Sequence, residues 1–320
     1  MKGWKAGAAI LLVCGVALAP TAQAAPKFIS IATGGTGGAY FPIGAGLADI
    51  INKKLTGYNA SAEVTSASKV NCINVNEGKS DLALVLGDTL SYGYRGEKLG
   101  GFPKPLTNLR VIANIYPNTI QIVARKDSGV VKLADLKGKK VSVGAPGSGT
   151  EINARQIFAA ARMSYHDFGR TDYLSFSESA DQMKNRAIDV TLISSGLPNP
   201  GILDIATSQE ITIVPIEGEL LKILDKDTPF FVASVIPKGT YKGQDRDVSS
   251  VAIPNFLITR ADLDEKTVYE ITKAMFENLD RLVQAHAAAK GIRLEDAAKG
   301  LPVPLHPGAE KYYRERKVIK

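Results

Sequence analysis

The order of hydrophobic and polar positions along the chain predicts strands and helices in alternation. Phe28–Ala32 is a short apolar run typical of a strand. It leads through a glycine-rich loop at 33–38 into a segment whose apolar residues recur at helical spacing. A second unit of the same kind follows, in which the strand 141–143 leads through the glycine loop 144–149 into another helix. Strand, glycine loop and helix thus open each half of the chain.

The other expected elements keep this alternation. Further strands are expected around Val64 and at 81–85, 109–115, 120–124, 188–193, 211–214 and 256–259, and further helices at 68–77 and 264–289. Strands that alternate with helices build a mostly parallel sheet covered by helices. The pattern therefore predicts an α/β protein with two lobes.

The first 24 residues have the pattern of a secretory signal peptide. Two lysines precede an apolar run at 6–19, and the small residues of an A-x-A motif follow at 22–24. The run has about 14 residues, fewer than the ~20 of a membrane-spanning helix. We expect cleavage between Ala24 and Ala25, which makes the product a soluble periplasmic protein.

A lipid anchor at Cys14 is not expected. This cysteine lies inside the apolar run and follows the bulky Val13 where a small residue is needed. Removal of residues 1–24 leaves 296 residues, with 37 basic and 32 acidic side chains and Cys72 as the remaining cysteine.

Composition narrows the classes of function. Of the 320 residues, 45% are hydrophobic and 22% are charged, which excludes wholesale disorder. The 39 Lys and Arg residues exceed the 32 Asp and Glu residues modestly and form no block, so nucleic acid is not the expected partner. Two cysteines and three widely separated histidines, His166, His286 and His306, build no disulfide framework or metal centre. We expect no cofactor and no metal.

The two glycine loops are the strongest candidates for chemistry. A strand that ends in glycines and feeds a helix presents free backbone N–H groups and the positive end of a helix dipole, which together suit an anion. The candidates are Gly34 to Gly38, with Thr36, and Gly147 to Thr150, with Ser148. Two tight structural turns are the alternative. Both loops can face one cleft, because ligands of open α/β sheets bind beyond the carboxyl ends of the strands.

Nucleotide binding fits neither loop. A dinucleotide fingerprint that starts at Gly35 needs a glycine where Tyr40 stands, and a P-loop that starts at Gly144 needs a lysine where Thr150 stands.

Other polar residues follow strands at comparable positions, each with a structural alternative. Ser68 and Asn71 begin the helix at 68–77, where Ser68 can also be an N-cap. Asp88 can bind ligand or cap the next helix, and Tyr40 can cover a ligand or lie in the core. Gly196, which follows two serines after a strand, can likewise have a ligand-binding or a structural role. His306, in front of a Pro-Gly pair, is expected to be structural.

No catalytic set is visible. The chain has no G-x-S-x-G elbow, no H-E-x-x-H motif and no cysteine–histidine pair with an orienting group.

Four segments in order along the chain resemble the TAXI-type solute receptors of TRAP transporters. They are Ile31–Gly44, Asp135–Lys139, Gly144–Thr150 and Leu305–Tyr313, and with the spacing between them they span nearly all of the chain after residue 24. The resemblance implies a type II periplasmic binding protein fold, in which two lobes joined by crossover strands close on a ligand. It places lobe I at 25–122 plus 254–320 and lobe II at 123–253, with boundaries good to about eight residues.

The resemblance also implies a ligand and a partner. Members of the family are associated with acidic amino acids and dicarboxylates such as glutamate and 2-oxoglutarate, which they deliver to a TRAP-type permease. The expected ligand-binding residues are Gly34, Thr36, Gly37, Gly38, Tyr40, Ser68, Asn71, Asp88, Gly147, Ser148, Gly149, Thr150 and Gly196. The family commonly has Gln-Ser-Asp where this chain has Leu86-Gly87-Asp88, so two hydrogen-bonding groups of the family are missing here.

The sequence therefore predicts a monomeric receptor for a small organic anion rather than an enzyme. In this hypothesis the Gly147–Thr150 loop holds a carboxylate, while Tyr40 and Asn71 hold the other end of the ligand. An exported enzyme that acts on a small carboxylate in the same cleft is the alternative, with Asp88 as its carboxylate. A scaffold or adhesin without a small ligand is a third class.

Overall fold

The computed structural model describes Met1, residues 25–227 and residues 230–320 of the chain. The expected signal peptide therefore lies almost entirely outside the described residues, and its cleavage stays a prediction.

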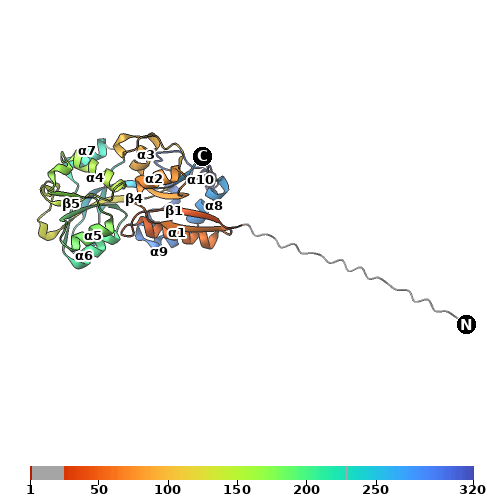
Figure 1. Ribbon diagram of the computed structural model, residues 1–320, viewed down its shortest axis with the longest axis horizontal. Coiled ribbons are helices and arrows are strands. Elements are labelled where there is room, and N and C mark those ends of the chain that lie inside the picture. Colours follow the sequence, from red (N-terminus) through yellow and green to blue (C-terminus); the bar gives the residue numbers. More distant parts are fainter. Residues whose placement is uncertain (2–24, 228–229) are drawn as a thin grey trace.

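The helices and strands alternate as the sequence pattern indicates (Figure 1). The first part of the chain forms β1 (Lys27–Ala32), α1 (Tyr40–Lys54), β2 (Tyr58–Glu63), α2 (Ser68–Asn76), β3 (Leu82–Leu86), α3 (Gly87–Arg95) and β4 (Leu109–Arg125). The middle part forms β5 (Lys140–Ser142), α4 (Gly149–Ala160), β6 (Arg170–Asp172), α5 (Phe176–Lys184), β7 (Val190–Ser195), α6 (Pro200–Ser208), β8 (Ile211–Val214), α7 (Gly218–Asp227) and β9 (Val232–Ile236). The last part forms β10 (Val248–Arg260), α8 (Glu265–Phe276), α9 (Leu279–Ala285) and α10 (Pro307–Glu315).

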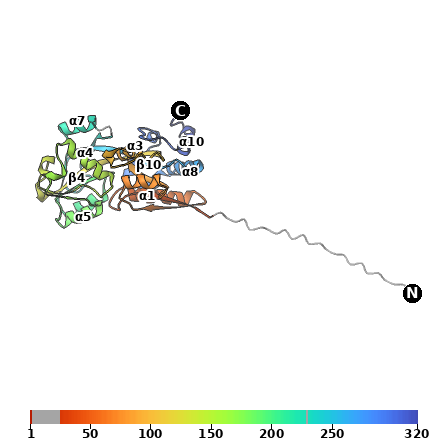
Figure 2. The ribbon, with the colours of Figure 1, turned by 45° about the horizontal axis from the view of Figure 1, so that its top comes forward.

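One sheet of ten strands runs through both lobes. In lobe I, β1 pairs in parallel with β2 and β3, and in lobe II, β5 pairs in parallel with β6 and β7. The long strands β4 and β10 are antiparallel to each other and belong to both lobes. Figures 1 and 2 show the two groups of helices on either side of these strands, with α4 to α7 in one lobe and α1, α3 and α8 in the other.

β4 is one continuous strand, whereas the sequence predicts two strands separated by Tyr116–Thr119. The interval stays in the ladder because β10 pairs with it: Asn118 lies opposite Ile253, and Pro117 lies opposite Pro254. A proline has no N–H to donate, so this pair adds no N–H donor to the ladder between the lobes.

Each lobe has its own apolar core. Ile31, Leu47 and Ile271 belong to the core of lobe I, and Val141 and Leu192 belong to that of lobe II; all five are fully or nearly fully buried. The single helix expected at 264–289 is two helices. Asn278 leaves the helical conformation, and its side-chain Nδ2 donates to the carbonyl of Ala274 at 2.8 Å, which ends α8.

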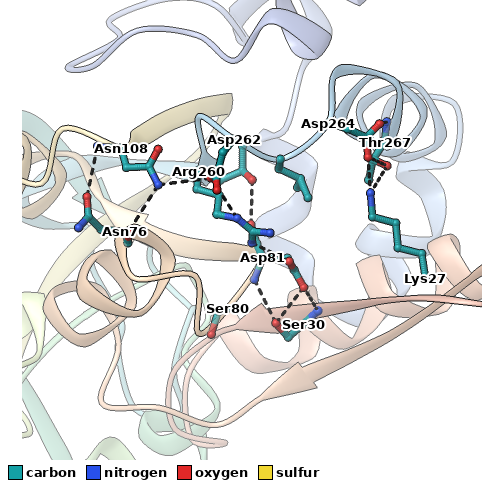
Figure 3. Close-up of polar contacts among 12 residues, drawn as sticks. Lys27, Ser30, Asn76, Ser80, Asp81, Asn108, Arg260, Asp262, Asp264 and Thr267 are labelled. Atoms are coloured by element: carbon teal, nitrogen blue, oxygen red, sulfur yellow. Dashed lines mark hydrogen bonds and ion pairs between the residues drawn. The ribbon is translucent and has the colours of Figure 1, made fainter.

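Polar contacts fasten lobe I at some distance from the glycine loops. The Asp81 carboxylate accepts from the backbone N–H of Ser30 at 3.0 Å and from Arg260 Nη1 at 2.8 Å, which ties β1, β3 and β10 together (Figure 3). His306 is structural, as expected: its buried ring contacts the Leu263 carbonyl through Nε2 at 2.8 Å and caps α10 through Nδ1.

Candidate functional site

A cavity of about 60 Å³ lies between the lobes. Its walls come from the loops after β1, β2, β5 and β6 and the helix starts that follow them, from the ends of β3 and β7, and from the middle of β4. The lining residues are Gly34, Gly35, Gly38, Ala39, Tyr40, Thr65, Ser66, Ala67, Ser68, Leu86, Asn118, Ala145, Ser148, Gly149, Thr150, Ser175, Phe176, Ser194 and Ser195. A buried water occupies roughly 10–15 Å³ on this measure, so the cavity has room for about four to six waters.

Four helices begin at the wall of this cavity. Their first residues, Tyr40 of α1, Ser68 of α2, Gly149 of α4 and Phe176 of α5, all line it. The first turn of a helix carries N–H groups without an intrahelical partner and the positive end of the helix dipole. Four such ends around one small space favour an anion there.

The helix ends of the two lobes differ in how they are capped. In lobe II, Ser148 accepts a hydrogen bond from the N–H of Glu151, and Ser175 forms a reciprocal capping box with Glu178. In lobe I, within the part of the chain that the structure describes, neither α1 nor α2 receives a side-chain cap. The N–H groups of lobe I are therefore the freer of the two sets.

The lining is uncharged. Among the lining residues that the structure describes there is no Asp, Glu, Lys, Arg or His. The charge of a bound anion would thus be balanced by helix ends, backbone N–H groups and hydroxyls rather than by a cationic side chain.

The lobes are closed around the cavity. The carbonyl of Gly37 in lobe I accepts from Asn199 Nδ2 at 3.1 Å and from the N–H of Gly201 at 3.2 Å, both in lobe II. Gly149 of lobe II packs so tightly on lobe I that an added Cβ would lie 2.5 Å from Leu86 Cδ1. A Cβ at Gly37 would lie 2.9 Å from the backbone nitrogen of Ser177. These glycines are needed where the lobes meet.

The structure brings part of the expected site together. Seven of the expected residues line the cavity, namely Gly34, Gly38, Tyr40, Ser68, Ser148, Gly149 and Thr150. Six do not, namely Thr36, Gly37, Asn71, Asp88, Gly147 and Gly196. Thr36 is exposed, and Gly196 packs against Ala288 and Tyr116. Gly147 has the positive φ of a turn, 72°, and lies near Val70.

Asn71 lies behind the cavity wall. Its Nδ2 donates to the carbonyls of Thr33 at 2.7 Å and Leu84 at 2.9 Å, and its Oδ1 accepts from Thr65 Oγ1 at 2.6 Å. Both ends of the amide are occupied, so Asn71 fixes the strand ends instead of facing the cavity. Ser68 is not the N-cap of α2; its hydroxyl accepts from the N–H of Leu86 at 3.1 Å.

Asp88 joins the lobes behind the cavity. Its carboxylate accepts from Thr89 in lobe I, and from Asn153 Nδ2 at 2.7 Å and Gln156 Nε2 at 3.2 Å on α4 of lobe II. Burial raises the pKa of Asp88 to about 6, although these hydrogen bonds act against the rise. Burial and the nearby charge of Asp88 also raise the pKa of the Cys72 thiol, which makes that buried cysteine a weak nucleophile.

Tyr40 connects the cavity to the strands that cross between the lobes. Its hydroxyl donates to Asn255 Oδ1 at 2.6 Å, and Asn255 Nδ2 donates to the carbonyl of Tyr116 at 2.8 Å. Burial raises the pKa of Tyr40 well above its ordinary value, so the phenol stays protonated.

Sequence reasoning missed several lining residues. The S-x-x-E capping box of Ser175 and Glu178 is a sequence signal that could have placed Ser175 at a helix end. Asn118 carries no such signal, because it lies inside a strand and its role depends on which strand lies beside it. Its Oδ1 and the Oγ of Ser194 have no hydrogen-bond partner among the described residues.

No group of His, Cys, Asp and Glu side chains among the described residues has the arrangement of a metal centre. No helix in the described ranges combines the length and apolar character of a membrane span.

Comparison with known proteins gives a family and a fold. The model of the NMT1-like family matches residues 31–316. The alkanesulfonate-binding protein SsuA from Xanthomonas axonopodis pv. citri, solved with MOPS, is 13% identical over 93% of this chain and 96% of that chain, with a TM-score of 0.50. A binding protein of an ABC phosphonate transporter from Pseudomonas aeruginosa is 14% identical over 92% and 85%, with a TM-score of 0.51. The periplasmic binding protein BugD is 12% identical over 92% and 95%, with a TM-score of 0.56.

These likenesses bear on the fold alone. They confirm the expected α/β architecture, the two-lobed type II periplasmic binding protein fold.

Proposed function

The chain belongs to the NMT1-like family, and we propose that it is an extracytoplasmic receptor that captures a small organic anion between its lobes. The observation that carries this proposal is the convergence of four helix N-termini on one small, uncharged cavity between the lobes. Anions bind at helix N-termini because N–H donors and the helix dipole act together. A neutral ligand would make no use of this field.

The uncapped lobe I is the better place for the negative charge. The helix ends of α1 and α2 have no side-chain cap among the described residues, whereas those of α4 and α5 do. We prefer this assignment to the sequence-based hypothesis that the Gly147–Thr150 loop holds the carboxylate, because Ser148 Oγ already satisfies one N–H of α4, that of Glu151. The order of events is capture on lobe I, followed by closure of lobe II over the anion.

Closure has to be favoured by the ligand itself. A ligand shifts an equilibrium between open and closed forms only by its differential affinity for the two. Lobe II adds Ser148, Thr150 and Ser194 to the wall of the cavity, so a ligand that reaches both walls favours the closed form. The ligand is thereby buried and held by both lobes.

The finer parts of the proposal rest on the sequence. The four segments that resemble TAXI receptors support delivery to a TRAP-type permease, export to the periplasm after cleavage before Ala25, and lobe boundaries near residues 122 and 254. They also support an acidic amino acid or a dicarboxylate as ligand, although the departure at Gly87 weakens the transfer of the family's usual ligand. We take the receptor to be monomeric.

An enzyme in the same cleft is less well supported. Acid–base catalysis needs a titratable group within reach of the substrate. Asp88, the carboxylate of that alternative, has both oxygens occupied by hydrogen bonds and does not line the cavity. Tyr40 lines it, but the raised pKa makes Tyr40 a poor base.

Ligand-induced stabilisation tests the proposal. The protein is unfolded and refolded to remove any ligand carried through purification, and is then heated with single carboxylates and amino acids. A ligand at 1,000 times its Kd stabilises by ~4 kcal/mol, which raises Tm by several degrees. A saturable rise with one acid is expected. Equal Tm values with every acid, together with a saturable rise for an uncharged compound, would contradict the anion assignment, and turnover of a bound acid would favour the enzyme.

A further inference from the structure

Asn118 and Ser194 form a polar corner in the cavity wall. Asn118 lies on β4 and Ser194 lies beside it on β7, and both line the cavity. The two side chains belong to residues that are 2% and 4% exposed. Asn118 Nδ2 donates to the backbone carbonyl of Ser194 at 3.2 Å, which links the two strands.

The orientation of the Asn118 amide follows from that contact. A backbone carbonyl only accepts, so the NH₂ of Asn118 has to face Ser194 and the Oδ1 has to face the other way. Neither Asn118 Oδ1 nor Ser194 Oγ has a hydrogen-bond partner among the described residues. The Tyr40 hydroxyl lies near Asn118, but its proton is donated to Asn255 and is not available to Asn118 Oδ1.

Buried polar atoms without partners are uncommon, and leaving them unpaired costs free energy. Asn118 Oδ1 is a pure acceptor, so it needs a donor, and the Ser194 hydroxyl can supply a proton to an acceptor. A single ligand hydroxyl meets both needs, because it donates one proton to Asn118 Oδ1 and accepts one from Ser194 Oγ.

Other ligand groups fit this corner less well. An oxo group accepts from Ser194 but leaves Asn118 Oδ1 unpaired, and a CH₂ group pairs with neither. An ammonium group donates to Asn118, but it brings a positive charge into a space surrounded by four helix N-termini, with no carboxylate among the described lining residues. That field raises the energy of a cation for the same reason that it lowers the energy of an anion.

We propose that the receptor selects a short hydroxy acid, with its carboxylate at the uncapped helix ends of lobe I and its hydroxyl between Asn118 Oδ1 and Ser194 Oγ. The inference rests on the proposed function and narrows its ligand class. The volume of about 60 Å³ sets the size, because room for roughly four to six waters suits an acid of a few carbon atoms.

Two matched series of acids test the selection by isothermal titration calorimetry at pH 7 with the refolded protein. The three-carbon series is lactate (both enantiomers), propionate, pyruvate and alanine. The five-carbon series is 2-hydroxyglutarate, glutarate, 2-oxoglutarate and glutamate. In the series that binds, the hydroxy acid is expected to bind at least tenfold more tightly than each partner, which corresponds to ~1.4 kcal/mol.

A variant identifies the group responsible. Asn118→Ala is expected to reduce the preference for the hydroxy acid over the unsubstituted acid from at least tenfold to about twofold. Asn114→Ala is the control, since Asn114 is on the same strand and donates to the Lys299 carbonyl outside the cavity. If Asn118→Ala does not fold, Ser194→Ala gives the same comparison, because it removes the hydroxyl and keeps the carbonyl that Asn118 contacts.

The outcomes separate this inference from the proposed function. If acids bind but the amino, oxo or unsubstituted acid binds as tightly as the hydroxy acid, or if Asn118→Ala and Ser194→Ala both keep the preference, the inference is overturned and the receptor function stands. If no acid of either series binds, both are overturned.

Discussion

The two lobes offer helix ends to one cavity, but they prepare them differently. In lobe II, Ser148 and Ser175 cap α4 and α5 from within the chain. In lobe I, the residues at the cap positions of α1 and α2 are Ala39 and Ala67, and neither provides a side-chain hydrogen bond. Alanine is among the poorest N-cap residues, so the sequence itself leaves these two helix ends without a side-chain cap.

This difference indicates that the two lobes have different roles in binding. A helix end without a cap gains most from a ligand oxygen, whereas a capped end is already stable and can act as a preformed lid. Gly149 also fits the role of lobe II as a cover. Gly149 is required for the contact of lobe II with lobe I more than for contact with a ligand, as the 2.5 Å approach of its added Cβ to Leu86 indicates. Substitutions in each lobe test this difference.

The largest effect is expected when closure is blocked. Gly149→Val places a branched side chain against Leu86, Ser68 and Thr89, so lobe II cannot seat on lobe I. The affinity for the best acid ligand should fall at least a thousandfold, or ~4 kcal/mol, in a calorimetric titration. Gly129→Asn is the control in the same lobe, because among the described residues an added Cβ there meets no atom within 4 Å and asparagine tolerates its φ of 74°. An unchanged affinity in Gly149→Val would mean that closure does not contribute to binding.

The next effect concerns the contact that Asp88 makes between the lobes. The pKa of Asp88 is raised from 3.8 to about 6, so the folded protein keeps a proton that the unfolded chain has released between these pH values. The contribution of this group to stability therefore falls as pH rises through that window, by about 3 kcal/mol in total. Asp88→Asn removes the titration.

Urea unfolding at pH 4 and pH 7 measures this contribution. The free energy of unfolding of the wild type should fall relative to that of Asp88→Asn as pH rises from 4 to 7. Asn153 can turn its unpaired Oδ1 toward the new amide, which keeps a contact between the lobes. A constant difference between the two proteins across this range would show that Asp88 titrates at its ordinary pKa.

A smaller effect is expected at the capped end of lobe II. Ser175→Ala removes the acceptor of the Glu178 N–H and breaks the capping box of α5. The loss should be about 1 kcal/mol of unfolding free energy, seen as a decrease of roughly 2 °C in Tm by calorimetry. Ser177→Ala, in the first turn of the same helix, is the matched serine change that leaves the cap intact. Equal losses in the two variants would argue against the cap.

The smallest effect is expected at the uncapped end of lobe I. Ala67 has φ 68° and ψ −150°, a region that glycine adopts readily and alanine does not. Ala67→Gly should relieve strain of ~1 kcal/mol, part of which is offset by the greater freedom of glycine in the unfolded chain, for a net gain of about 0.5 kcal/mol. Urea unfolding of the ligand-free protein measures it, and a loss of stability would show that the conformation is unstrained.

The fold could be predicted from local patterns to a large extent. The strand–glycine loop–helix units at the start of each lobe are visible because apolar periodicity and glycines coincide there. The extended conformation at 116–119 is not visible in the sequence, because these residues are typical of a loop. They stay extended through pairing with strands far away in the sequence, at Pro254 on β10 and at Ser195 on β7. The position of Asn278, which divides the expected helix at 264–289, is likewise decided by a side-chain contact with Ala274.

The residues of the candidate site also fall into those that the local sequence pattern places and those that distant contacts place. Residues next to a glycine loop, such as Tyr40 and Ser148, line the cavity because backbone position alone takes them there. Asn71 and Asp88 follow strands in the same manner, yet their side chains turn to carbonyl groups and to α4. Asn118 reaches the cavity only because β4 passes between the lobes. Sequence thus indicates the edge of the sheet, and side-chain pairing across the fold decides which residues face the space.

The pairing of β4 with β10 means that lobe II can be removed from the chain without separating these two strands. Thr119 and Ala252 lie opposite each other in antiparallel strands, so lobe II enters and leaves at adjacent points. Two antiparallel strands can be joined by a two-residue turn. Lobe II is in this sense an insertion into a β-hairpin of lobe I. A chain in which an Asn-Gly turn replaces residues 120–251 would keep β4 and β10 paired as a hairpin. Such a chain gives a route to the first lobe as an independent, smaller protein.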